Sequence, residues 1–187
     1  PAEISVRTWT KPSLMNEVAS WLAMRTVYAK CLNKWESEHD AQIAVFGAAA
    51  YVSGDYDERG RWIPEDHTTV AWPLCEWFMG LATGKADGYR GDQVSFAVLA
   101  LTHESGHLRG WRRATLDSED EASTERWALR HVYAVARRIG LTPEASVAVL
   151  WYAVKLHMLL PKSYRTDDCT KPYVSADGRL ADCGSLV

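Results

Sequence analysis

The chain has 187 residues, of which 47% are hydrophobic and 24% charged, a composition typical of one globular domain with a single core. No apolar run approaches the ~18 residues that a membrane-spanning helix needs, so this sequence predicts no transmembrane segment. The formal net charge of −3 argues against a protein dedicated to nucleic-acid binding, and we interpret the local basic cluster of Arg109, Arg112 and Arg113 as a solvated loop.

The first part of the chain predicts one helix followed by a small sheet. Apolar residues recur with helical period over residues 13–35, which predicts a helix there. Residues 43–52 could form either a strand or a buried helix, because periodicity alone does not separate the two. Residues 61–64 and 67–72 have the composition of extended strands. We therefore expect a small antiparallel sheet within residues ~43–72.

The second part of the chain predicts four helices. A short helix is expected over residues 73–81, and a longer apolar one begins near Asp92, which we predict to be its N-cap. A third helix ends before Gly140, where a helix-terminating glycine belongs, and a fourth begins at Thr142 and stops at Pro161. We expect the last two helices to pack as an antiparallel pair against the long apolar one.

The long apolar helix contains the sequence His-Glu-Ser-Gly-His at residues 103–107. Residues four apart share a face of a helix, so His103 and His107 can point both imidazoles at one divalent ion. Glu104 then lies beside the ion rather than on it, where it can take a proton from a water molecule that the ion activates. The alternative is that hydrogen bonds satisfy both histidines on a partly exposed helix end.

A catalytic zinc ion requires a third protein ligand. Gly110 fits one known continuation of the motif, the metzincin pattern, but Arg113 stands where that pattern has its third histidine, and a guanidinium cannot bind a cation. The downstream segment instead offers Glu121 and Glu125, which lie on one helix face. Glu121 has an alternative role, because Ser118-x-x-Glu121 is also a good helix-capping box.

The segment from about residue 92 to residue 130 resembles the gluzincin branch of the zincin metallopeptidases. The resemblance implies that Glu121 is the third zinc ligand and that Glu125 is a carboxylate that orients a ligand histidine. The linker between His107 and Glu121 is short for this branch, so Glu125 stays a rival for the third ligand.

The resemblance further implies a zincin-like domain, α+β and mainly α, with a small antiparallel sheet packed on the motif helix. It predicts a zinc-dependent peptidase acting on a peptide or protein substrate, with Glu104 as general base. An oxyanion-stabilising donor is also expected, and spacing does not choose between its candidates, His131, Tyr152, His157 and Tyr164. The alternatives are a non-catalytic zinc-stabilised scaffold and a zinc amidase acting on cell-wall peptides.

Cysteine usage indicates an exported protein. The four cysteines allow three pairings, and none has the spacing of a metal knuckle. We predict a Cys169–Cys183 disulfide in the turn-rich C-terminal tail, residues 162–187, of a single domain spanning residues 1–187, and a second disulfide between Cys31 and Cys75. A loose likeness to uncharacterised exported bacterial proteins also favours an extracellular or cell-envelope location. The alternative is four unpaired buried thiols in a cytosolic protein.

Overall fold

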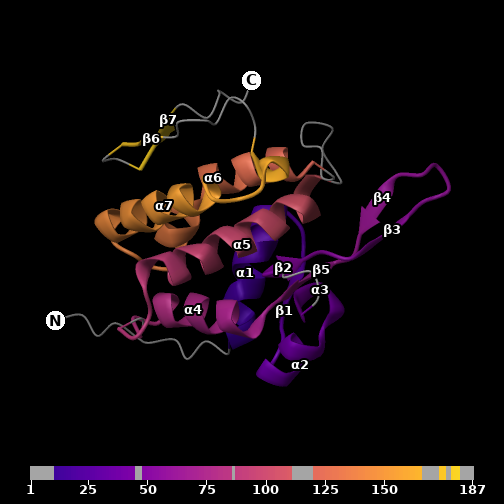
Figure 1. The fold of residues 1–187 in the computed structure, drawn as a ribbon, viewed down its shortest axis with the longest axis horizontal. Helices are drawn as coiled ribbons and strands as arrows, with labels where there is room; N and C mark the ends of the chain where they lie inside the picture. The colour runs from indigo at the N-terminus through magenta and orange to yellow at the C-terminus, as the bar shows by residue number, and fades with distance from the viewer. Residues whose placement is uncertain are drawn as a thin grey trace.

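The computed structural model of the chain describes residues 11–44, 48–85, 87–110, 120–165, 173–175 and 178–181. It has the predicted fold class, a mainly helical α+β architecture with a small sheet (Figure 1). The elements in chain order are α1 (Lys11–Ala23), β1 (Tyr28–Cys31), α2 (Lys34–His39), α3 (Ala41–Ala44), β2 (Ala50–Tyr51), β3 (Gly54–Tyr56), β4 (Trp62–Pro64), β5 (His67–Val70), α4 (Trp72–Ala82), α5 (Gly91–Gly110), α6 (Glu121–Arg138), α7 (Pro143–His157), the 3-10 helix η1 (Lys162–Tyr164), β6 (Tyr173–Val174) and β7 (Leu180–Ala181).

Helix α5 is the central element of the core. It packs against α6 and α7 on one side and against α1, α4 and the sheet on the other (Figure 1). Its residues Val98, Leu101 and Leu108 are completely buried. The helix begins at Gly91, so Asp92 lies in its first turn and pairs with Arg90 instead of serving as the predicted N-cap.

The connection between α6 and α7 confirms the predicted helix boundaries. Gly140 has a φ of 98°, the left-handed conformation that glycine adopts most easily, and its N–H donates to the Arg137 carbonyl while the next N–H, from Leu141, reaches Ala136. The Thr142 hydroxyl then accepts from the Ala145 N–H at the start of α7. This short turn makes α6 and α7 the expected antiparallel pair against α5. Helix α7 ends at His157, before Pro161.

The single helix predicted over residues 13–35 is wrong. Helix α1 ends at Ala23, and Met24 follows with a φ of 55°, so the chain turns away from the helix axis. Residues 28–31 form β1 because they pair with β5, and the Ala29 N–H also donates to Asn16 Oδ1 at 2.7 Å. Long-range pairing therefore overrides the local helical pattern.

The sheet differs from the predicted antiparallel sheet. Its strand order is β1-β5-β2, with β1 parallel and β2 antiparallel to β5, so it is mixed. The parallel strand comes from residues that the sequence pattern assigned to a helix. Of residues 43–52, which could have been a strand or a helix, residues 43–44 end α3 and residues 50–51 form the short edge strand β2, while residues 45–47 lie outside the described residues. The sheet packs on α5 through β5 and β2, as expected.

Strands β3 and β4 form a separate antiparallel hairpin whose tip projects from the body of the molecule (Figure 1). At the tip, the Asp57 carboxylate accepts hydrogen bonds from the N–H groups of Arg59 and Arg61 and pairs with the Arg61 guanidinium. These bonds fix the turn.

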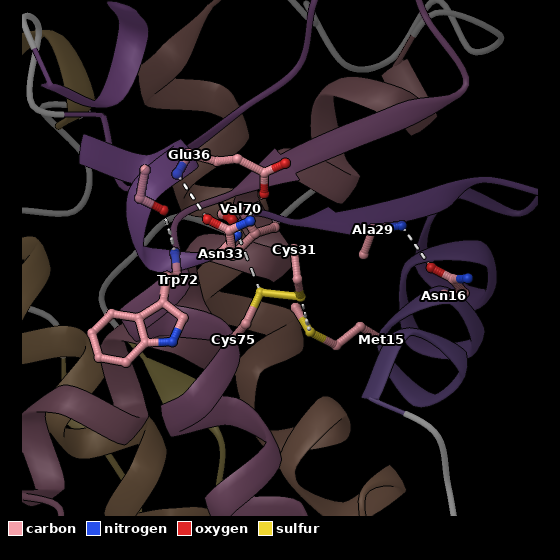
Figure 2. The surroundings of a disulfide bond; sticks show 10 residues. Met15, Asn16, Ala29, Cys31, Asn33, Glu36, Val70, Trp72 and Cys75 are labelled. Carbon is pink, nitrogen blue, oxygen red and sulfur yellow. Dashed lines mark hydrogen bonds between the residues drawn. A yellow bond between two sulfur atoms is a disulfide. The ribbon is translucent and has the colours of Figure 1, made fainter. Parts of the chain in front are cut away.

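The Cys31–Cys75 disulfide is present as predicted and joins β1 to α4 (Figure 2). Figure 2 shows it beside Met15 of α1, whose sulfur lies 3.4 Å from Cys31 Sγ. The other predicted pair, Cys169 and Cys183, lies outside the described residues. None of the described helices is both long enough and apolar enough to cross a bilayer.

Candidate metal centre

The last turns of α5 carry the two histidines of the motif and the glutamate between them. His103, Glu104 and His107 are all buried, which shows that the motif does not lie on a solvated helix end. The imidazoles of His103 and His107 meet with their Nε2 atoms 3.0 Å apart. Helical spacing thus brings the two rings to one point, as the sequence predicts.

The first turn of α6 directs Glu121 toward these histidines. Asp120 is the N-cap of α6, and its carboxylate accepts from the N–H groups of Ala122 and Ser123. Glu121 is therefore at the first helical position and not at the third, where a capping-box glutamate stands. Its Oε2 lies 2.9 Å from His103 Nε2 and 3.5 Å from His107 Nε2. Ser118, the other partner in the capping-box alternative, lies outside the described residues.

The three facing atoms of His103, His107 and Glu121 form a compact triangle that could hold a metal ion. Its sides measure 2.9, 3.0 and 3.5 Å. Donor atoms about 2.1 Å from a tetrahedral zinc ion stand roughly 3.4 Å from one another. The triangle therefore has nearly the size that such an ion requires, and its donors are of the type that zinc accepts.

Glu125 lies one helical turn after Glu121 and contacts the opposite side of the His103 ring. Its Oε2 is 2.8 Å from His103 Nδ1, whereas the triangle is formed by the Nε2 atom of that ring. With only 2% of its surface exposed, Glu125 accepts the Nδ1–H of His103 and thereby orients the ring. The structure thus places Glu121 and Glu125 at different atoms of one imidazole.

The cluster is electrostatically suited to a cation. Burial lowers the pKa of His103, but hydrogen bonds to Glu121 and Glu125 outweigh burial and raise the pKa to about 10. Burial opposes ionisation of Glu121 and Glu125, but hydrogen bonds from neighbouring histidines hold the pKa of each well below its usual range. Burial raises the pKa of Glu104. Carboxylates that stabilise an added proton here would also stabilise a divalent ion.

A cavity of ≈ 780 Å³ opens onto the cluster. It lies between α5, the edge strand β2, the β3–β4 hairpin and η1. Its lining is aliphatic and aromatic apart from Gln42 and the histidines and glutamates of the cluster; the other lining residues are Ala48, Ala49, Ala50, Tyr51, Val52, Tyr56, Trp62, Phe96, Leu99, Ala100, Leu160, Pro161 and Tyr164. A cavity of this size and chemistry is typical of a binding site.

Trp62 is a cavity residue that sequence reasoning missed. Its ring stands edge-on to His107, with the ring centres 6.3 Å apart. The indole lies across Gly54, where an added Cβ would come within 2.5 Å of its Nε1 atom. The glycine of β3 therefore allows the tryptophan of β4 to lie at the cavity. No local signal distinguishes Trp62, because its place depends on pairing within the hairpin.

Of the four candidate oxyanion donors, Tyr164 is the one that lines the cavity. Its ring centre is 5.7 Å from that of His103, and burial, with the nearby charges of Glu121 and Glu104, raises its pKa to about 12. His131 instead donates from Nδ1 to the Trp127 carbonyl. Tyr152 lies against Gly91 at the other end of α5, and His157 is buried behind Glu125.

Comparison of the chain with protein-family models, with curated proteins and with solved structures found no match. The function of the chain is therefore inferred from its side-chain geometry.

Proposed function

We propose that this protein is a zinc-dependent hydrolase that cleaves peptide bonds. His103, His107 and Glu121 hold the ion, and Glu104 is the general base. The observation that supports the proposal most strongly is the triangle of ligand atoms, whose sides of 2.9, 3.0 and 3.5 Å suit a tetrahedral ion. It forms beside a buried glutamate and at the base of a large cavity.

The donor set agrees with a catalytic ion. Structural zinc sites have four protein ligands, whereas two histidines and one glutamate leave a fourth position for water or substrate. When bound, zinc would polarise the substrate carbonyl and make a water molecule more acidic. A purely structural site has no use for a base such as Glu104, and this favours an enzyme over a zinc-stabilised scaffold.

Glu104, Glu125 and Tyr164 would then have different roles in hydrolysis, according to their positions around the ion. Glu104, whose pKa is raised by burial, accepts the proton of the attacking water and passes it to the leaving amine. Glu125 holds the His103 ring through Nδ1–H, which leaves the Nε2 lone pair facing the ligand triangle. Tyr164 remains protonated at neutral pH and can donate a hydrogen bond to the oxyanion that develops during attack.

The cavity supports an extended peptide as substrate. Ala50 and Tyr51 of the edge strand β2 line it, and a strand at the edge of a sheet can pair with an added extended chain. Aromatic side chains such as Trp62 and Phe96 offer an apolar wall for a substrate side chain. An amidase acting on cell-wall peptides could use the same groups, so both substrate types belong in the test.

Metal analysis tests the ligand set. We expect one zinc per chain by mass spectrometry in protein purified without added metal, and its loss from the His103→Ala and Glu121→Ala variants. Glu125→Ala should keep the ion with lower affinity, and His131→Ala, a matched control on α6, should keep it fully. Loss of zinc from Glu125→Ala but not from Glu121→Ala would contradict the ligand assignment. Correctly folded wild-type protein that takes up no zinc would overturn the proposal.

A substrate screen tests the reaction. The zinc-loaded protein is incubated with a peptide mixture and, separately, with cell-wall peptides, and new termini are identified by mass spectrometry. Products that depend on both zinc and Glu104 would support a hydrolase and identify the bond. Zinc-loaded protein that cleaves neither set would contradict the proposed reaction and favour the scaffold alternative.

A further inference from the structure

His157 lies behind the metal centre, in contact with Glu125, which in turn contacts the proposed ligand His103. It is the last residue of α7, and 1% of its surface is exposed. Its ring faces Glu125 of α6, which is itself 2% exposed and contacts His103 of α5. Three helices thus each contribute one buried polar side chain to a single line of contacts that ends at the ligand triangle.

The distances show how this line is connected. Glu125 Oε2 is 2.8 Å from His103 Nδ1, and Glu125 Oε1 is 3.4 Å from His157 Nδ1. Among the described residues, Glu125 Oε1 and both ring nitrogens of His157 make no hydrogen bond in the present geometry. Buried polar atoms without a partner are costly. The contact between Glu125 and His157 is therefore the interaction that can satisfy Oε1.

We infer that His157 is a positioning residue for the metal centre. Its Nδ1 lies 3.4 Å from one oxygen of Glu125, and a hydrogen donated from Nδ1 to this oxygen holds the carboxylate so that the other oxygen faces His103. His103 in turn keeps its Nδ1 hydrogen and directs its Nε2 lone pair at the ion. The inference rests on the proposed zinc site, and it adds a residue that touches neither the ion nor the cavity.

A packing role alone would not require a histidine at this place. The neighbouring buried positions of α7 toward its start, Val149, Leu150, Ala153 and Val154, are all apolar. An apolar side chain at residue 157 would fill the same space but leave Glu125 Oε1 without a donor. The two roles therefore predict different results for substitutions of similar volume.

Zinc affinity measured by chelator competition, with zinc as the only ligand, separates these roles. We expect His157→Leu to weaken zinc binding roughly 10- to 100-fold, the range typical of residues that orient a ligand. His157→Asn, whose amide nitrogen can take the place of Nδ1, should bind more tightly than His157→Leu. Val149→Ala, a matched substitution in the core of α7, should lower thermal stability and leave zinc affinity unchanged.

A double-mutant cycle shows whether His157 acts through Glu125. In the Glu125→Gln background, His157→Leu should cause little further loss of affinity, because the carboxylate that it positions is gone. If His157→Leu does not fold, His157→Gln is tested in its place. The amide nitrogen of glutamine falls near the Nε2 position of the histidine ring, so glutamine should not restore zinc binding as asparagine does.

The outcomes distinguish this inference from the proposed function. Wild-type zinc affinity in folded His157→Leu, or an equal loss in Val149→Ala, would overturn the positioning role and leave the hydrolase proposal intact. Weakened binding in His157→Leu, together with a wild-type protein that cleaves no peptide, would support the positioning role and contradict the proposed reaction. A wild-type protein with no zinc affinity would overturn both.

Discussion

Glu104 and Glu125 are both buried carboxylates beside His103, yet their surroundings move their pKa values in opposite directions. Burial raises the pKa of Glu104. Burial also opposes ionisation of Glu125, but the hydrogen bond from His103 and the nearby His157 imidazole outweigh burial and lower the pKa of that carboxylate. A raised pKa suits a group that must accept a proton, and a lowered pKa suits a permanent anion that orients a ring.

At the scale of a single residue, the Glu104→Gln variant tests catalysis separately from metal binding. The amide cannot accept the proton of water, so kcat should fall by about 100-fold or more, in line with the usual contribution of a general base. Zinc content should not change, because Glu104 is not one of the proposed ligands. Peptide hydrolysis and metal analysis on the same preparation check both points. A kcat within tenfold of wild type in the zinc-loaded variant would contradict the role of Glu104.

The approach of helix α6 to α5 depends on Gly106, within the motif. A Cβ added at Gly106 would lie 2.9 Å from Thr124 Cγ2 and 2.9 Å from the Trp127 ring. Both contacts are closer than side chains normally allow. The glycine therefore lets α6 come near enough for Glu121 and Glu125 to reach the histidines of α5.

Gly106→Ala should consequently destabilise the protein, although alanine is the better helix former by about 1 kcal/mol. Overpacking typically costs about 1–3 kcal/mol, and we expect the free energy of unfolding in urea to fall by that order. Zinc affinity should fall as well, because α6 carries Glu121. Gly88→Ala is the matched control, since an added Cβ there meets nothing within 4 Å. Equal effects at the two positions would contradict the packing argument.

The Cys31–Cys75 disulfide connects two elements that the sheet alone does not join, β1 and α4, across a sequence separation of 44. Replacing both cysteines with serine should lower the free energy of unfolding by about 2–4 kcal/mol, chiefly by freeing the unfolded chain. Urea unfolding of the variant against the oxidised wild type measures this difference. Stability equal to that of the wild type would show that the bond contributes no net stabilisation.

At the scale of the whole molecule, the candidate site joins parts of the chain that are far apart in sequence. The cavity is lined by β2, the β3–β4 hairpin, α5, α6 and η1, and α7 supplies His157 behind it. The ligands of the proposed ion come from two helices, α5 and α6. An ion bound there would stabilise the native state and have no comparable site in the unfolded chain.

Zinc should therefore raise the melting temperature. At a free zinc concentration a thousandfold above Kd, the added stability is about 4 kcal/mol. Differential scanning calorimetry with and without zinc measures the shift, and a chelator should reverse it. His103→Ala is the control, because it should show no shift. A wild-type melting temperature that does not change with zinc would contradict binding to the native state.

Much of the fold was predictable because its signals are local. Gly140 and Thr142 act within one turn of the chain, so the boundary between α6 and α7 follows from residue type alone. The predictions that failed concern long-range contacts. Residues 28–31 form a strand because they pair in parallel with β5, and no residue near them in the sequence indicates that pairing. The zinc, the peptidase reaction and the export of the protein remain predictions.

The sequence by itself determined that His103 and His107 share one face, because the helical repeat places residues four apart together. It also determined that Glu121 and Glu125 were the carboxylates to consider. Only the tertiary structure decided between them, because the atom of His103 that each reaches depends on how closely α6 approaches α5 across Gly106. The places of Trp62, Tyr164 and His157 were decided in the same way, since each belongs to an element that only packing brings to the site.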